Sequence, residues 1–369
     1  MFSPCRRGVS SGLSSLPPQS KTMLRLQRLF FYPLEHKKMR TNHSGTENIH
    51  YCFESSNTSC LKHVYPTTIR APLYVLLGAT VLLTVLGNLL VIVTISHSKQ
   101  LHTPTNYLIL SLAVSDFLLG AVVMPPSLIR SLETCWYLGD WFCKIHTSIE
   151  TLLTAASVFM LYLISVERYV AVSQPLLYHA LITTRVAKYM ILTCWALSAL
   201  VTFGMELNSL IIQDVYLTQL NCKGRCAVIL DKTSSILSSL FLFFIPGLFM
   251  LGLYLKILVI AHKQARSIQV TILIAENREK TTIILSKMEQ KSTRTLGIVT
   301  AVFLSCWSPC FICIIIDPVT GLSTPYLYEI FVWMCYLNSG MNPIIYSFLF
   351  KWFRESLRKD FSKILNSFD

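Results

Sequence analysis

Residues 71–96 read APLYVLLGATVLLTVLGNLLVIVTIS, a run of 26 residues without a charged side chain. About 20 apolar residues are enough for a helix to cross a bilayer, so this run predicts a transmembrane helix. Six further segments outward from it are similarly apolar: 107–129, 141–172, 189–205, 234–255, 296–316 and 326–350. We therefore predict an all-α membrane protein, a seven-transmembrane helix bundle over residues 71–350.

The composition agrees with a membrane protein. Of the 369 residues, 53% are hydrophobic and only 14% are charged, against about 25% charged in soluble domains. This excludes an ordinary soluble enzyme, and no HExxH, P-loop or GxSxG motif is present in the sequence. The net charge of +13 would suggest nucleic acid in a soluble protein, but here we expect membrane lipids and no nucleic acid as partners.

The basic residues predict the topology. With the N-terminus outside, segments 97–106, 167–188, 256–295 and 351–369 are cytoplasmic, and they hold 17 of the 32 Lys and Arg residues. The outer segments from residue 39 onward hold 8. Because Lys and Arg accumulate on the cytoplasmic side, we predict a multi-pass plasma-membrane protein with an extracellular N-terminus.

Residues 1–70 form the predicted extracellular tail, but residues 1–38 carry 7 cations against this rule. We interpret 1–38 as an upstream extension from gene-model error or alternative initiation; the alternative is a genuine basic tail. Beyond it, Asn42 and Asn57 each begin an N-x-S/T sequon and are predicted glycosylation sites. At the other end, residues 351–369 form a predicted cytoplasmic amphipathic helix and tail on the membrane surface.

The outer cysteines predict disulfides, which persist outside the cell. Cys143 opens the third span and Cys226 lies in the second outer loop, so a Cys143–Cys226 bridge would hold this loop over the bundle. A second bridge would join the remaining Cys222 to the tail, which offers Cys52 and Cys60. We prefer Cys52–Cys222; free thiols are the alternative.

Two carboxylates lie inside predicted spans, where a charge costs roughly 2.5–3.5 kcal/mol and marks a functional site by default. Asp116 lies in mid-span, and polar residues of other spans could meet it to hold a proton or a sodium ion: Asn88, Ser157, Asn338, Ser339 and Asn342. That sodium ion is the single cofactor candidate, and no other metal is predicted. A hydrogen-bonded packing core is the alternative.

Glu150 lies two helical turns below Cys143 on a face of the third span that includes Thr154. A carboxylate there could neutralise a ligand cation, or simply pair with a neighbour such as Tyr336. Aromatic side chains of the sixth and seventh spans could add cation–π contacts, and serines of the fifth span could bind the far end of a ligand. These candidate ligand-binding residues are Trp307, Phe311, Trp333, Tyr336, Ser238 and Ser239.

Glu167-Arg168-Tyr169 ends the third span on the inner side. A carboxylate–guanidinium pair can lock a closed state, and its release would free Arg168 for a partner. Pro246, Pro309 and Pro343 each fall inside a span, where proline kinks a helix.

These residues together resemble the rhodopsin-like (class A) G-protein-coupled receptors. The resemblance covers residues 71–366 and rests on motifs in successive spans: Gly87-Asn88, 112–116 (LAVSD), 167–169 (ERY), Trp195, 306–309 (CWSP) and 342–346 (NPIIY). It implies a small-molecule ligand, a heterotrimeric G protein as partner, and Tyr346 as part of the switch with 167–169. It also implies a receptor, not an enzyme.

A narrower resemblance is to the trace-amine-associated receptors, through segments 101–106 (LHTPTN), 135–137 (CWY), 143–148 (CKIHTS) and 338–353 (NSGMNPIIYSFLFKWF). It implies small amine ligands, a stimulatory G protein with a rise in cyclic AMP, an olfactory role and a tail-to-loop disulfide similar to Cys52–Cys222. The family's amine-binding aspartate corresponds to Glu150 here. A non-amine or altered ligand is therefore the alternative within the receptor class, and a transporter is the remote alternative.

Overall fold

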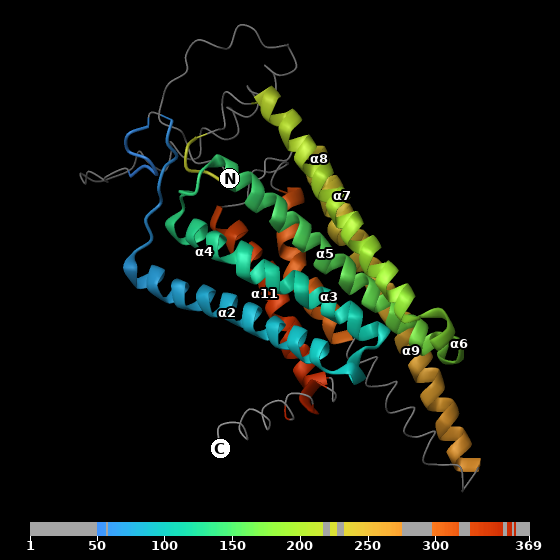
Figure 1. The fold of residues 1–369 in the computed structure, drawn as a ribbon. Coiled ribbons are helices and arrows are strands. Elements are labelled where there is room, and N and C mark those ends of the chain that lie inside the picture. The colour runs from blue at the N-terminus through green and yellow to red at the C-terminus, as the bar shows by residue number, and fades with distance from the viewer. Residues whose placement is uncertain are drawn as a thin grey trace, which may run out of the picture.

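The computed structural model describes residues 50–216 except 57, 222–226, 232–274, 297–316, 325–349, 353–355 and 358. Its long helices lie side by side in one bundle (Figure 1). Their bounds are α2 (Thr67–His97), the short η2 (Lys99–Leu101), α3 (Pro104–Leu118), η3 (Leu119–Val123), α4 (Met124–Glu133), α5 (Asp140–Ser173), α6 (Pro175–Leu181), α7 (Thr184–Tyr216), α8 (Lys232–Ser239), η4 (Leu240–Phe244), α9 (Ile245–Ile274), Gly297–Ile316 and α11 (Pro325–Leu349).

Six helical segments in the described ranges are long and apolar enough to cross a membrane: Thr67–His97, Pro104–Glu133, Asp140–Ser173, Thr184–Asn208, Thr233–Lys263 and Gly297–Ile316. The seventh predicted span is α11, which has 25 residues and packs against α2 and α3. α11 is more polar because Glu329, Asn338, Ser339 and Asn342 lie on it. The predicted all-α bundle is confirmed.

Large apolar side chains cover the outside of the bundle, the reverse of a soluble protein. Val75, Leu82 and Leu248 are 73%, 61% and 67% exposed. Polar side chains such as Asn88 and Asp116 are instead buried, each at 0% exposure. A lipid environment explains this distribution, since lipid solvates apolar side chains and leaves polar groups to find partners inside the protein.

Two spans contain π-helical turns next to proline. η3 precedes Pro125 and Pro126 in α4, and η4 precedes Pro246 in α9. Proline has no N–H to donate and its ring crowds the preceding turn, so the hydrogen-bonding pattern changes there. In the second span this irregular turn lies at Val123, whose carbonyl oxygen contacts a functional side chain described below.

Three disulfides lie at one end of the bundle, next to residues 50–66. They join Cys143 to Cys226, Cys60 to Cys222 and Cys52 to Cys135, with Cα–Cα separations of 5.6, 5.0 and 5.7 Å. The Cys143–Cys226 bridge is the one predicted. The predicted Cys52–Cys222 pairing is wrong. Cys222 is bonded to Cys60, the other tail cysteine, and Cys52 is bonded to Cys135 on the turn between α4 and α5.

The backbone register of the tail explains this pairing. The Cys60 N–H donates to the Lys223 carbonyl at 3.0 Å, and the Lys223 N–H donates to the Thr58 carbonyl at 2.8 Å. Cys60 therefore lies beside Cys222, whereas Cys52 contacts Gly224, whose φ is +103° and whose added Cβ would lie 2.6 Å from the Cys52 Cβ. Glycine is thus required at 224.

The C-terminal segment 351–369 is described only at 353–355 and 358. Phe353 is 1% exposed and packs into the core of the bundle. Arg354 Nη1 donates to the Ser347 carbonyl at 3.1 Å, which joins this segment to the end of α11. The rest of the predicted amphipathic helix lies outside the described residues.

Candidate functional site

Glu150 of α5 lies in the outer half of the bundle and meets α11. The Tyr336 hydroxyl donates to Glu150 Oε1, and Ser127 Oγ of α4 lies 3.2 Å from the Tyr336 hydroxyl. Tyr336 is 3% exposed and Ser127 is buried. Three helices therefore hold one carboxylate oxygen of Glu150 in place, and the predicted pairing of Glu150 with Tyr336 is present.

His146 lies one turn before Glu150 on α5 and is only 2% exposed. Its Nε2 atom lies 3.0 Å from the Val123 carbonyl oxygen and 3.3 Å from Ser127 Oγ. Its Nδ1 atom lies 4.0 Å from Glu150 Oε2, too far for a hydrogen bond. Trp136 packs against the imidazole ring, with the ring centroids 5.2 Å apart.

Two further charged residues belong to this region and were not among the predicted site residues. Arg130 of α4 lies within electrostatic range of both Glu150 and Glu329. Glu329 of α11 accepts a hydrogen bond from Ser131 Oγ at 2.6 Å, and Trp333 Nε1 donates to that same Ser131 oxygen at 3.1 Å. Glu329 was visible as the single charge of the last apolar segment, whereas Arg130 falls one residue beyond segment 107–129.

The charges in this cluster leave an excess of one negative charge. Glu150 and Glu329 contribute two formal negative charges, and Arg130 contributes one positive charge. Since Arg130 offsets only one carboxylate, the cluster favours one additional monovalent cation.

The predicted aromatic residues form two groups. Trp307 stacks on Phe311, with centroids 5.8 Å apart, and Phe311 stacks on Phe243 of η4 at 5.0 Å. Trp333 meets Tyr336 edge-on at 5.3 Å. Tyr336 therefore contacts Glu150 directly, while Trp307 and Phe311 belong to an aromatic stack shared with the fifth span.

The two serines predicted on the fifth span use their hydroxyls within their own helix. Ser238 Oγ and Ser239 Oγ donate to the Ser235 carbonyl at 3.1 and 2.7 Å. Ser239 is fully buried and Ser238 is half-buried. Thr154, one turn inward of Glu150, is also half-buried. In this arrangement both serine hydroxyl hydrogens are committed to the backbone.

Asp116 and its predicted neighbours come together in the middle of the bundle. Ser157 Oγ donates to Asp116 Oδ1 at 2.8 Å, and Asn342 Nδ2 donates to Asp116 Oδ2 at 2.7 Å. Asn88 Nδ2 donates to the Ser339 carbonyl at 3.1 Å. These polar groups come from four helices, α2, α3, α5 and α11. In an apolar interior they would otherwise lack partners, so their mutual bonding stabilises the bundle.

The donor set at Asp116 fits a small hard cation, which prefers oxygen ligands. Both carboxylate oxygens and the Ser157 hydroxyl are buried within one cluster. Asn88 Oδ1 is a buried oxygen without a hydrogen-bond partner among the described residues. Asn338, the last predicted member, is 2% exposed on α11.

Glu167 and Arg168 form the predicted pair at the opposite end of the bundle. Arg168 Nη2 lies 2.5 Å from Glu167 Oε1, and Arg168 Nε donates to Glu167 Oε2 at 2.6 Å. Thr105 of α3 donates to Glu167 Oε1 at 2.8 Å, and the Tyr178 hydroxyl of α6 donates to the same oxygen. Glu167 is 0% exposed, so four donors satisfy a carboxylate that water does not reach.

Tyr178 was not predicted, because α6 lies in a connection between spans. Burial raises the pKa of Tyr178, and the nearby Glu167 carboxylate raises it further. The phenol therefore stays protonated and able to donate. Of the two remaining switch candidates, Tyr169 packs beside Val172 and Ile257, and Tyr346 is 3% exposed in the core.

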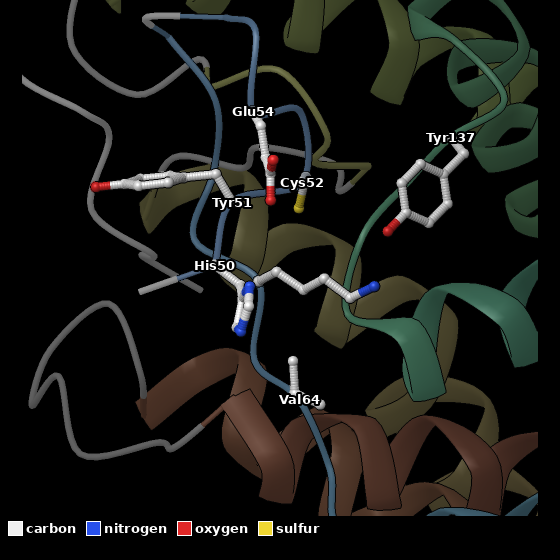
Figure 2. A pocket seen from close by; sticks show the side chains of 7 residues that line it. His50, Tyr51, Cys52, Glu54, Val64 and Tyr137 are labelled. Carbon is white, nitrogen blue, oxygen red and sulfur yellow. The ribbon is translucent and has the colours of Figure 1, made fainter. Parts of the chain in front are cut away.

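A separate pocket of about 460 Å³ lies under the tail, apart from these clusters. Figure 2 shows its lining, which comes from the tail segment and from Tyr137 on the turn after α4. Its lining residues are His50, Tyr51, Cys52, Glu54, Lys62, Val64 and Tyr137. Glu150 is not among them, so this pocket is not the predicted ligand site. Asn42 and Asn57, the predicted glycosylation sites, lie outside the described residues.

Comparison with known proteins places the chain in a family. The family described as "7 transmembrane receptor (rhodopsin family)" matches residues 87–346. Trace amine-associated receptor 1 of Macaca mulatta is 45% identical over 313 residues, which cover 84% of this chain and 93% of that protein.

Two further relatives are receptors of the same name series. Trace amine-associated receptor 4 of Mus musculus is 42% identical over 322 residues, 85% of this chain and 92% of its own length. Trace amine-associated receptor 13c of Danio rerio is 40% identical over 312 residues, 83% and 90% of the two chains. The chain therefore belongs to the rhodopsin family of seven-transmembrane receptors, and within it to the trace amine-associated receptors.

Proposed function

We propose that this receptor binds small extracellular amines, with Glu150 as the counter-ion of the ligand ammonium group. As a member of its family the chain is a multi-pass plasma-membrane protein and not an enzyme. The positive-inside distribution and the three disulfides support an extracellular N-terminus. The half of the bundle that contains Glu150 then lies on the extracellular side.

One observation carries the proposal: Glu150 presents one carboxylate oxygen that Tyr336 does not use, within a cluster of net negative charge. Tyr336 orients Glu150 through Oε1, while Oε2 lies 4.0 Å from His146 Nδ1, beyond hydrogen-bond distance. Arg130 offsets only one of the two carboxylates. A monovalent ammonium ion would balance the remaining charge and gain a charge-assisted hydrogen bond.

The opposite end supports signalling through a heterotrimeric G protein, which we propose to be stimulatory with a rise in cyclic AMP. Arg168 is held by Glu167, and Glu167 by Thr105 and Tyr178. A ligand that binds the open arrangement more tightly shifts the population toward it. Release of Arg168 would then expose a guanidinium for the G protein.

The test is an amine panel with a cyclic AMP readout on wild type and on Glu150→Gln. This change keeps an acceptor for Tyr336 and removes the charge. Loss of a buried ion-pair partner costs about 2 kcal/mol or more, so potency should fall about 30-fold or more. Glu206→Gln is the matched control, because Glu206 is another outer-half acid and accepts from Ser148 Oγ at 2.8 Å. Equal amine potency in wild type and Glu150→Gln would disprove the counter-ion role.

The alternative is an altered or non-amine ligand. It is favoured by the proximity of Arg130, which already supplies a cation within electrostatic range of Glu150. Under this alternative wild type ignores the amine panel, and Glu150→Asp, which shortens the acid by one methylene, creates amine responses. The same panel therefore separates the two functions.

A further inference from the structure

We propose that His146 is a specificity-determining residue that makes this receptor prefer primary and secondary amines to tertiary ones. The proposal rests on the amine function proposed above and concerns the same site. The structural basis is a pair of acceptor atoms, Glu150 Oε2 and His146 Nδ1, which lie 4.0 Å apart. The ligand class is an ammonium ion with at least two N–H donors.

The surroundings of His146 determine which of its nitrogens carries hydrogen. A neutral imidazole has one donor nitrogen and one acceptor nitrogen. Nε2 lies 3.0 Å from the Val123 carbonyl oxygen, which can only accept, so Nε2 carries the hydrogen. Nδ1 then bears a lone pair. This atom is buried and has no hydrogen-bond partner within the described part of the chain.

The charged side chains of this cluster are Glu150, Arg130 and Glu329. Glu150 lies one turn after His146 on α5, with Oε2 4.0 Å from Nδ1. Arg130 of α4 lies within electrostatic range of that carboxylate. Glu329 of α11 is already bonded to Ser131 at 2.6 Å. When a ligand ammonium ion occupies the site it supplies the one additional cation, and a neutral imidazole then offers Nδ1 as an acceptor.

A chain of hydrogen bonds holds the two acceptors in place. His146 Nε2 approaches Ser127 Oγ at 3.3 Å, Ser127 lies 3.2 Å from the Tyr336 hydroxyl, and Tyr336 donates to Glu150 Oε1. Glu150 Oε1 is therefore occupied, and Oε2 and His146 Nδ1 are the two atoms left to receive a ligand. Because both are fixed through buried partners, the acceptor pair is preorganised.

The 4.0 Å separation matches one nitrogen with two hydrogens. If a ligand nitrogen lies about 2.9 Å from both acceptors, the acceptor–nitrogen–acceptor angle is about 90°. This is near enough to the tetrahedral angle between two N–H bonds for both hydrogens to be donated. A primary or secondary ammonium ion can donate to both atoms at once. A tertiary ammonium ion has one N–H, so it would leave His146 Nδ1 buried and without a donor, which costs free energy.

The experiment uses the full-length receptor and a methylation series of one ligand: 2-phenylethylamine, its N-methyl derivative and its N,N-dimethyl derivative. Potency is measured at matched surface expression in wild type, His146→Phe and His146→Asn. His146→Phe keeps an aromatic ring beside Trp136 and removes the acceptor. His146→Asn keeps an oxygen acceptor near the position of Nδ1.

In wild type the potency should fall at the step from secondary to tertiary amine, by about 10- to 150-fold, the value of one hydrogen bond to a charged group. His146→Phe should weaken the primary amine by a similar factor and leave the tertiary amine within about threefold, so the discrimination disappears. His146→Asn should retain part of it. If His146→Phe fails to reach the surface, His146→Asn and the wild-type series still test the preference.

Three results would overturn the proposal while the amine function stands. These are equal wild-type potency across the series, discrimination that persists in His146→Phe, or higher potency of every amine in His146→Phe. The last result would mean that His146 acts as a competing cation. Failure of the whole panel on wild type, or insensitivity to Glu150→Gln, would instead overturn the proposed function and this inference with it.

Discussion

Removing the Tyr178 hydroxyl should make the receptor active without ligand. Tyr178 donates to Glu167 Oε1, and Glu167 is 0% exposed. Tyr178→Phe deletes this donor and leaves Thr105 and Arg168 as partners. The closed arrangement therefore loses a hydrogen bond to a buried carboxylate, worth about 1.5–3 kcal/mol.

This energy converts into a population. If the active state holds about 1% of the receptor, a shift of 1.5 kcal/mol raises it to roughly 10%, and 3 kcal/mol raises it to roughly 60%. Tyr178 is only half-buried, so water can partly replace the lost hydroxyl and the smaller value is expected. The raised pKa of Tyr178 keeps the phenol protonated, so its hydrogen bond to Glu167 should be present across physiological pH.

The assay is ligand-independent G-protein activation per receptor at the cell surface, measured with a panel of Gα sensors so that no coupling type is assumed. Tyr107→Phe is the matched control. It removes a hydroxyl at the same end of the bundle and keeps the ring, which lies 5.9 Å from Lys188 Nζ. Basal activity of Tyr178→Phe within twofold of wild type, at normal surface expression, would refute the reasoning.

Three further predictions concern packing, sodium and the disulfides. A Cβ on Gly297 would lie 2.6 Å from the Tyr254 ring, so Gly297→Ala should cost about 1–3 kcal/mol in thermal unfolding of the purified receptor, whereas Gly252→Ala, which meets nothing within 4 Å, should not. Sodium should weaken amine potency in wild type and not in Asp116→Asn; an unchanged sodium response in the variant would contradict a sodium site at Asp116. Non-reducing peptide mapping should recover the bridges Cys52–Cys135, Cys60–Cys222 and Cys143–Cys226, and recovery of Cys52–Cys222 would contradict the register described here.

Much of the intramembrane polar network could be predicted because polar groups within a bilayer must find their hydrogen-bond partners inside the protein. Asp116, Ser157 and Asn342 were grouped from the sequence since each lies within an apolar span, and the structure bonds them directly. Glu167 and Arg168 are adjacent in the chain, so their pairing was local and visible. In both cases the sequence already contained the reason for the contact.

Contacts that depend on irregular backbone were not predictable. The preference for Cys52 over Cys60 failed because the register of the tail against Lys223 decides which sulfur reaches Cys222. Arg130 and Glu329 lie near the ends of apolar segments, where a sequence alone cannot distinguish a lipid-boundary charge from an inward-facing one. Ser238 and Ser239 suggested ligand contacts, yet the helix directs both hydroxyls to Ser235.

The sequence by itself determined the seven-helix bundle and the identity of its buried polar residues, because apolar runs and intramembrane charges have few physical solutions in lipid. The tertiary structure alone decided which side chains share a site. It brings Val123, Ser127 and Tyr336 to His146 and Glu150, and so decides which oxygen and which nitrogen are left for a ligand. Such choices depend on distances of a few ångströms between helices, which are set by helix packing and by π-helical turns that residue spacing does not reveal.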